Sequence, residues 1–216
     1  MGPLADFSTA GGKWMPDSRR WIELTDRVRP VFTIHDLGSP KSKREVPVAG
    51  FETNLRRKGD RMHLFFGGAV QGARLLGVTP GQRALLQIFP AQEDDRVHIA
   101  DVGLAPNSRP PMTFSIRFPR KSTIKEVATS PRGDRIAWLL SVADRSPDGK
   151  ASAKVELWTC LSDGSDLELI GEASPDGHNG PWDGCDAAVP NRIRWIPGSR
   201  DISFVCRNGL YAVTAR

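Results

Sequence analysis

Short apolar runs recur along the chain, and four of them follow a proline and a cluster of turn-forming residues. Proline fixes the backbone angle φ at the first corner of a tight turn, and Gly, Ser or Asp suit the positions after it. Each segment therefore predicts a hairpin corner followed by a β-strand. The four segments are 14–24, 78–88, 129–139 and 195–205.

Further apolar runs surround each corner, so each repeat predicts an antiparallel meander of about four strands. The strand after each corner is followed by another, near 31–38, 97–103, 155–161 and 210–214. Later strands are expected at 44–49, 112–118 and 167–172, and earlier ones at 73–79, 124–129 and 192–196. Residues 143–153 read as a long polar loop, and no segment requires a helix.

These repeats predict an all-β fold, a β-propeller of about four four-stranded antiparallel blades. The corner prolines, Pro16, Pro80, Pro131 and Pro197, are unevenly spaced. Uneven spacing argues against a solenoid, in which every repeat must stack in register. We expect a single propeller domain over residues 1–216. Its blades are predicted at 7–49, 73–118, 123–172 and 191–216, with insertions at 50–72 and 173–190.

The last predicted blade lacks a fourth strand after Tyr211, which leaves a partial or open propeller. The sequence leaves three alternatives open. Residues 2–8 could supply the strand and close a four-bladed ring, or the open edge could pair with a partner or another copy. The chain could also be a fragment of a larger ring, which we rank first.

The third repeat, Ser130-Pro131-Arg132-Gly133-Asp134-Arg135-Ile136-Ala137-Trp138, resembles the SPDGxxIAF repeat of TolB-like, WD40-like (PD40) propellers. The run 155–158 followed by 163–165 is similar to the strand and turn that come next in that family. The resemblance is weakest in the second repeat, where Gly81-Gln82 replaces Asp-Gly. It implies a propeller fold and does not select an activity.

Composition adds modest constraints. Net charge is +5, and the beginning of the chain shows no secretory signal, so a cytoplasmic location is expected, or a periplasmic or extracellular one if the N-terminus is truncated. No apolar run is long enough for a membrane span.

The cysteines and tryptophans are expected to be structural residues. We favour reduced structural thiols for Cys160, Cys185 and Cys206, with one disulfide plus a free thiol as the alternative. Five tryptophans are expected to pack between blades: Trp14, Trp21, Trp138, Trp158 and Trp195.

Two stretches are candidates for a binding rim. The first is the basic cluster Arg56, Arg57 and Lys58, which could contact phosphates, although a solvated loop is the preferred interpretation. The second is the loop 175–186, in which carboxylate and amide oxygens could suit Ca²⁺. Its spacing matches no EF-hand, so we favour a Gly-rich loop with no cofactor. Its candidate binding residues are Asp176, His178, Asn179, Trp182, Asp183 and Asp186.

No HExxH, GxSxG or Walker-type phosphate loop occurs in the sequence. We therefore expect a non-catalytic protein–protein interaction scaffold that is not an enzyme and that binds another protein or another copy of itself. One alternative is an accessory propeller domain, or a fragment, of a hydrolase, peptidase or lyase. The other is a weak binder of nucleic acid or of anionic ligands through the basic loops, with nucleic acid disfavoured.

Overall fold

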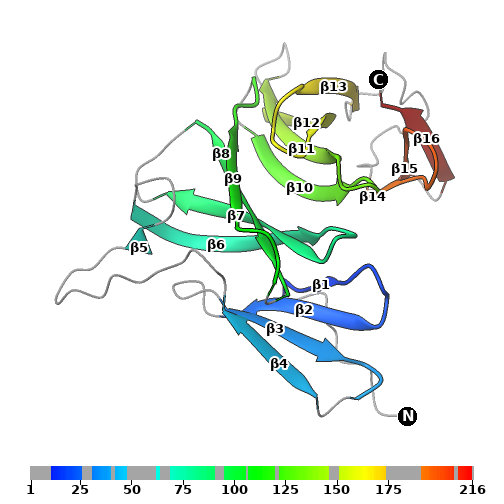
Figure 1. Cartoon of the computed structure of the whole chain (residues 1–216). Helices are drawn as coiled ribbons and strands as arrows, with labels where there is room; N and C mark the ends of the chain where they lie inside the picture. Colours follow the sequence, from blue (N-terminus) through cyan, green and yellow to red (C-terminus); the bar gives the residue numbers. More distant parts are fainter. Residues whose placement is uncertain are drawn as a thin grey trace. The chain divides into compact units, whose positions relative to one another are not determined.

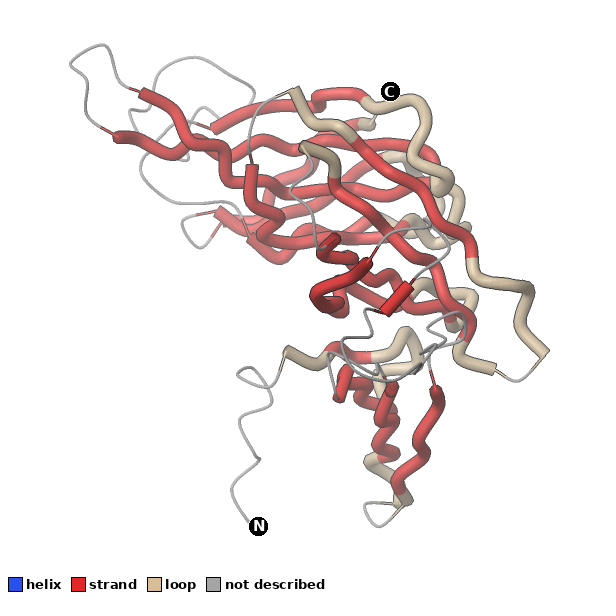
Figure 2. Tube along the Cα trace, turned by 90° about the vertical axis from the view of Figure 1, so that its left-hand side faces the viewer, coloured by secondary structure: helices blue, strands red, loops and turns tan. Residues whose placement is uncertain are grey.

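The structure is a computed structural model that describes residues 11–25, 31–39, 42–47, 62–63, 69–90, 95–105, 107–119, 122–145, 151–173, 191–206 and 209–215. These residues form strands and connecting turns without a helix (Figure 2). It follows that the described residues include no helix able to cross a membrane. The predicted all-β fold of antiparallel propeller blades is confirmed.

Four sheets follow one another along the chain, and in each sheet the strands are ordered as in the sequence (Figure 1). The first sheet contains β1 (Lys13–Trp14), β2 (Arg20–Thr25), β3 (Val31–Asp36) and β4 (Lys43–Pro47). The second contains β5 (Met62–His63), β6 (Ala69–Val78), β7 (Arg83–Pro90), β8 (Val97–Gly103) and β9 (Met112–Ile116). The third contains β10 (Ser122–Thr129), β11 (Arg135–Arg145), β12 (Ala151–Leu161) and β13 (Glu168–Ala173). The fourth contains β14 (Asn191–Trp195), β15 (Asp201–Cys206) and β16 (Gly209–Thr214).

The chain divides into two compact units, Met1–Ile116 and Arg117–Arg216. In the first unit the core joins the first two sheets, because Ile22 and Phe32 of one sheet pack with Leu86 and Val102 of the other. In the second unit the third and fourth sheets share a separate core. That core includes Leu139, Leu157, Ile193, Trp195 and Phe204.

The four proline corners have the same backbone hydrogen bond. The N–H of the residue before each proline donates to the first residue of the following strand, as from Ser130 to the carbonyl of Arg135 at 2.9 Å. The equivalent bonds join Met15 to Arg20, Thr79 to Arg83 and Ile196 to Asp201. In three corners the second residue after the proline has positive φ (Ser18, Gln82 and Gly133), whereas in the fourth it is Gly198, directly after Pro197. The sequence repeat therefore repeats the hydrogen bond in all four corners and the turn geometry in the first three.

Three details of the prediction need correction. Residues 143–145 and 151–153 extend β11 and β12 rather than forming a loop, because the two strands keep one register from Arg135↔Leu161 to Arg145↔Ala151. The insertion 50–72 contains β5 and the start of β6, which gives the second sheet a fifth strand. Trp14 is not a core residue. It is 49% exposed, and its ring lies edge-on against buried Trp21 at 5.4 Å between centroids.

The other predicted core tryptophans, Trp21, Trp138, Trp158 and Trp195, are buried. Cys160 is a buried free thiol, whereas Cys206 is disulfide-bonded, so the preference for reduced thiols throughout is wrong. Within the described residues, β16 is the outer strand of a three-stranded sheet, with Leu210 75% exposed. That this edge pairs with another copy stays a prediction.

Candidate functional site

The binding residues predicted from the sequence lie outside the described part of the chain. This applies to Arg56, Arg57 and Lys58, and to all six residues chosen from the loop 175–186. The described residues include no group of three or more His, Cys, Asp or Glu side chains that could hold a metal ion. A candidate site must therefore be built from other polar side chains.

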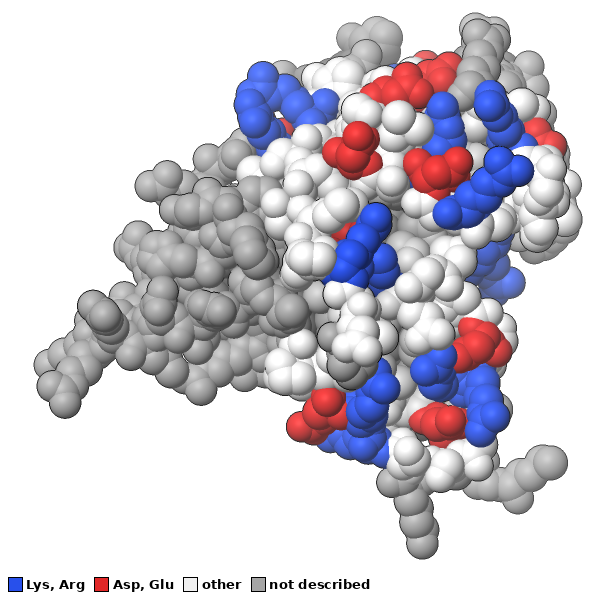
Figure 3. All heavy atoms as spheres, viewed as in Figure 1, with Lys and Arg blue, Asp and Glu red and all other residues white. Residues whose placement is uncertain are grey.

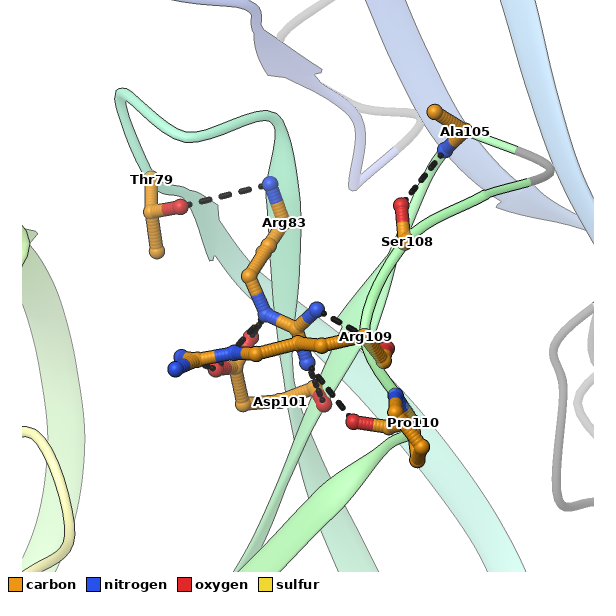
Figure 4. A network of polar contacts seen from close by, with 7 residues as sticks. All are labelled: Thr79, Arg83, Asp101, Ala105, Ser108, Arg109 and Pro110. Carbon is orange, nitrogen blue, oxygen red and sulfur yellow. Dashed lines mark hydrogen bonds and ion pairs between the residues drawn. The ribbon is translucent and has the colours of Figure 1, made fainter.

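Arg83 lies at the centre of a network of polar contacts in the first unit (Figure 4). It begins β7, and its Nε donates to both carboxylate oxygens of Asp101 on β8, at 2.8 and 2.9 Å. Its Nη2 donates to the backbone carbonyls of Asp101 and Pro110, and its Nη1 donates to that of Arg109. Arg109 Nη2 donates in turn to the Asp101 carboxylate at 3.2 Å.

This cluster fastens the β8–β9 connection and leaves little for a ligand. Every nitrogen of the Arg83 guanidinium already donates to an acceptor within the unit. Arg83 is 8% exposed and Asp101 is 5% exposed, so the pair is removed from solvent. Breaking a buried ion pair leaves an uncompensated charge, which is strongly unfavourable. We therefore assign the cluster a structural role.

A second buried charge lies on β12. Lys154 contacts Glu172 and also lies 3.2 Å from Glu156 Oε1, and Trp158 Nε1 donates to Glu156 Oε2 at 2.8 Å. Burial lowers the pKa of Lys154, but its hydrogen bonds to Glu172 and Glu156 outweigh burial and hold the pKa above its ordinary value. The lysine thus stays charged and paired, which also favours a structural role.

A third cluster joins β10 and β14, the first strands of the third and fourth sheets. These two strands pack against each other in the second unit. Glu126 on β10 accepts a hydrogen bond from Arg194 Nη1 on β14 at 2.9 Å and another from the N–H of Ile193 at 3.2 Å. Trp195 Nε1 donates to the carbonyl of Ala128 at 3.0 Å, which fixes the two strands side by side.

An irregularity in β10 directs Glu126 toward β14. Ile124 pairs with Leu140 and Glu126 pairs with Leu139, so Lys125 is an extra residue in the ladder. An extra residue reverses which face the later side chains occupy, because strand side chains alternate with a period of two. Glu126 therefore shares a face with Leu139 and Ala128 rather than with Ile124. That face belongs to the core shared with the fourth sheet.

A matching irregularity occurs in β14, between Asn191 and Arg194. Arg192 lies within it and has a φ of 55°, in the left-handed region that non-glycine residues rarely adopt. β-Bulges and such backbone conformations are concentrated near functional sites. Two adjoining strands that are both irregular at the same charged cluster therefore mark the strongest candidate among the described residues.

The four residues Lys125, Glu126, Arg192 and Arg194 are here called the first-strand site. Arg194 is 67% exposed and Glu126 is 22% exposed at the side chain, so both remain accessible from solvent. Lys125 and Arg192 are also exposed, and neither forms an ion pair with another described residue. Arg194 contacts the carboxylate, and two further cations lie nearby in the sequence, Lys125 next to Glu126 and Arg192 two residues before Arg194. The formal excess of positive charge favours an anionic ligand.

No sequence motif marks the first-strand site, so its residues are not among those predicted from the sequence. Nothing in Ile124-Lys125-Glu126-Val127-Ala128 distinguishes a bulged strand from a regular one. Elsewhere positive and negative side chains are intermixed on the visible face (Figure 3), and no continuous basic field of the kind that nucleic-acid binding requires is seen there among the described residues.

No family model matches the chain, and no curated protein matches it. One similar solved structure is a "putative 6-phosphogluconolactonase" from Bacteroides uniformis, with 12% identity and a TM-score of 0.30 over 93% of this chain and 79% of that chain. Another, of the same description, is from Bacteroides fragilis, with 12% identity and a TM-score of 0.31 over 90% of this chain and 62% of that chain. The resemblance to TolB-like repeats stays a prediction.

Both similar structures bear the name of an enzyme, which contradicts the expectation of a non-catalytic scaffold that is not an enzyme. That expectation rests on the lack of HExxH, GxSxG and Walker-type motifs, and such a lack does not exclude catalysis. Propellers can assemble a site from single side chains on separate blades, and such a site leaves no motif in the sequence. TM-scores of 0.30 and 0.31 are too low to transfer a substrate or a mechanism to this chain.

Proposed function

We propose that the first-strand site binds a small anionic ester and that Glu126 assists its hydrolysis. The observation that carries this proposal is the ion pair between Glu126 and Arg194, which joins two bulged strands that also carry the exposed cations Lys125 and Arg192. A carboxylate held among cations combines a proton acceptor with groups that attract an anionic substrate.

The proposed binding step uses the most exposed member of the pair. Arg194 can turn from Glu126 to the anionic group of the substrate, because its side chain is 67% exposed. Guanidinium groups match phosphate and carboxylate oxygens with two parallel hydrogen bonds. Lys125 and Arg192, exposed on the same two strands, add positive charge. Glu126 meanwhile keeps the hydrogen bond from the Ile193 N–H, which holds its carboxylate in place.

The proposed chemical step is general-base hydrolysis. Glu126 removes a proton from a water molecule while the water oxygen attacks the ester carbonyl carbon. The bond from that carbon to the alcohol oxygen then breaks, and the proton passes from Glu126 to the leaving alkoxide. No oxidant, reductant or second substrate is required. The products are a carboxylic acid and an alcohol, or a single hydroxy acid when the ester is a lactone.

A sugar-phosphate lactone is the first substrate to test, since the two similar structures carry that name and the site offers cations for its phosphate. Acid release from 6-phosphogluconolactone is followed at constant pH, and the spontaneous rate is subtracted. We expect catalysis by the wild type and its loss in Glu126→Gln. Arg132→Gln, which removes an exposed cation elsewhere in the same unit, serves as the matched control and should retain activity.

A further inference from the structure

Arg135 and Arg83 hold the same position in their respective sheets. Each is the first residue of the strand after a proline corner, and its carbonyl accepts the N–H of the residue before the proline. Thr159 and Asp101 are also equivalent. Thr159 pairs with Ala137 and Asp101 pairs with Leu85, in each case two residues after the arginine. Such diagonal neighbours lie on one face of an antiparallel sheet.

The two positions differ in how their polar groups are satisfied. Arg83 donates to the Asp101 carboxylate and to three backbone carbonyls. Arg135 donates through Nη2 to Asp166 at 3.0 Å, but its Nη1 is buried and has no hydrogen-bond partner among the described residues. The hydroxyl of Thr159, a residue that is 0% exposed, is also buried and finds no partner in the part of the chain that the structure describes.

Two unsatisfied polar atoms on one face of a sheet require a ligand. Burying a donor or a hydroxyl without a hydrogen bond is costly, and native proteins satisfy nearly all such groups. In the second sheet the carboxylate of Asp101 fills this role. In the third sheet Thr159 is an uncharged residue that does not hydrogen-bond to Arg135, and no other described residue supplies an acceptor for Arg135 Nη1.

We propose that one internal water molecule binds between Arg135 Nη1 and Thr159 Oγ1, in place of the carboxylate that Asp101 supplies in the second sheet. The water oxygen accepts from Arg135, and the water and the threonine hydroxyl hydrogen-bond to each other. The surrounding charges favour a neutral ligand over an anion. Asp166 already pairs with Arg135, and Asp134 and Asp163 lie in the adjoining turns. Ordered waters of this kind are a normal part of folded proteins.

The proposal is tested by counting long-lived internal waters with oxygen-17 relaxation dispersion of the solvent. Thr159→Val keeps the shape of the side chain and removes the hydroxyl, whereas Thr159→Ser keeps the hydroxyl. We expect Thr159→Val to lose one internal water relative to the wild type and Thr159→Ser to retain it. Arg135→Met removes the donor while keeping an unbranched side chain, and it should lose the same water, which keeps the test available if one variant does not fold.

The direction in which Thr159→Val shifts the midpoint of urea denaturation gives an independent result. A bridging water predicts a lower midpoint for Thr159→Val than for the wild type, because a satisfied network is broken. An unchanged number of internal waters, or a higher midpoint for Thr159→Val, would show that the hydroxyl is unsatisfied and would overturn the proposal. A midpoint that rises with chloride at constant ionic strength in the wild type, and not in Thr159→Val, would assign the site to an anion instead.

Discussion

Arg194 Nη1 lies 2.9 Å from Glu126 Oε1, and this ion pair connects strands of two different sheets, β14 and β10. Both strands carry one extra residue near the pair. The two irregularities therefore bring together side chains that a regular alternation would separate. An accessible carboxylate with an excess of cations follows from this arrangement, and it is the basis of the proposed hydrolytic function.

The Arg83–Asp101 pair should be a major contributor to the stability of the first unit. Asp101→Asn removes the negative charge and leaves the buried guanidinium uncompensated. We expect the free energy of unfolding to fall by about 3–5 kcal/mol, as for other broken buried pairs. Urea denaturation followed by circular dichroism measures it.

Asp36→Asn is the matched control, since it disrupts the solvent-exposed pair between Arg19 and Asp36 in the first sheet. Exposed pairs contribute little to stability, so this variant should behave nearly as the wild type. Equal losses in the two variants would show that burial does not set the strength of the Arg83–Asp101 pair.

The sequence predicts the blades well and the candidate site poorly. A tight turn needs a particular residue type at its first corner, so the corners can be predicted from four prolines: Pro16, Pro80, Pro131 and Pro197. The bulge at Lys125 requires no particular residue type, so the direction of the Glu126 side chain cannot be predicted from the surrounding sequence. The polar composition of residues 143–145 and 151–153 predicts a loop, although their pairing continues the β11–β12 ladder.

Gly133 tests the repeated corner geometry. Its φ is +71°, and a Cβ added there would meet no atom within 4 Å. Gly133→Ala therefore introduces backbone strain without a steric clash, and we expect a loss of about 1 kcal/mol in the free energy of unfolding. Gly81→Ala, at a corner position without positive φ, is the control and should be neutral or slightly stabilising. No difference between the two variants in chemical denaturation would refute the explanation.

Cys160 should make stability depend on alkaline pH. Burial is the main cause that raises the pKa of its thiol to about 11 from the ordinary value of 9.0, and the hydrogen bond from Trp138 Nε1 opposes it. The unfolded thiol loses its proton near pH 9, while the folded thiol keeps it. The folded state is therefore favoured fully below pH 9, and up to about 3 kcal/mol of stability is lost as pH rises from 9 to 11.

The measurement is the difference in unfolding free energy between the wild type and Cys160→Ala across this pH range. The variant should be less stable at neutral pH, and the difference should shrink as pH rises. A difference that stays constant from pH 8 to 11 would contradict a buried thiol with a raised pKa.

The central claim is that the first-strand site hydrolyses a small anionic ester with Glu126 as the base. Its most direct test compares wild type, Glu126→Gln and Arg194→Gln in acid release from 6-phosphogluconolactone, with Arg132→Gln as the control. We predict at least a hundredfold lower kcat for Glu126→Gln, consistent with roughly 10²–10⁴-fold from general-base catalysis. Arg194→Gln should mainly raise KM, because it removes a binding group. Activity of Glu126→Gln equal to that of the wild type, with all four proteins folded, would contradict the claim.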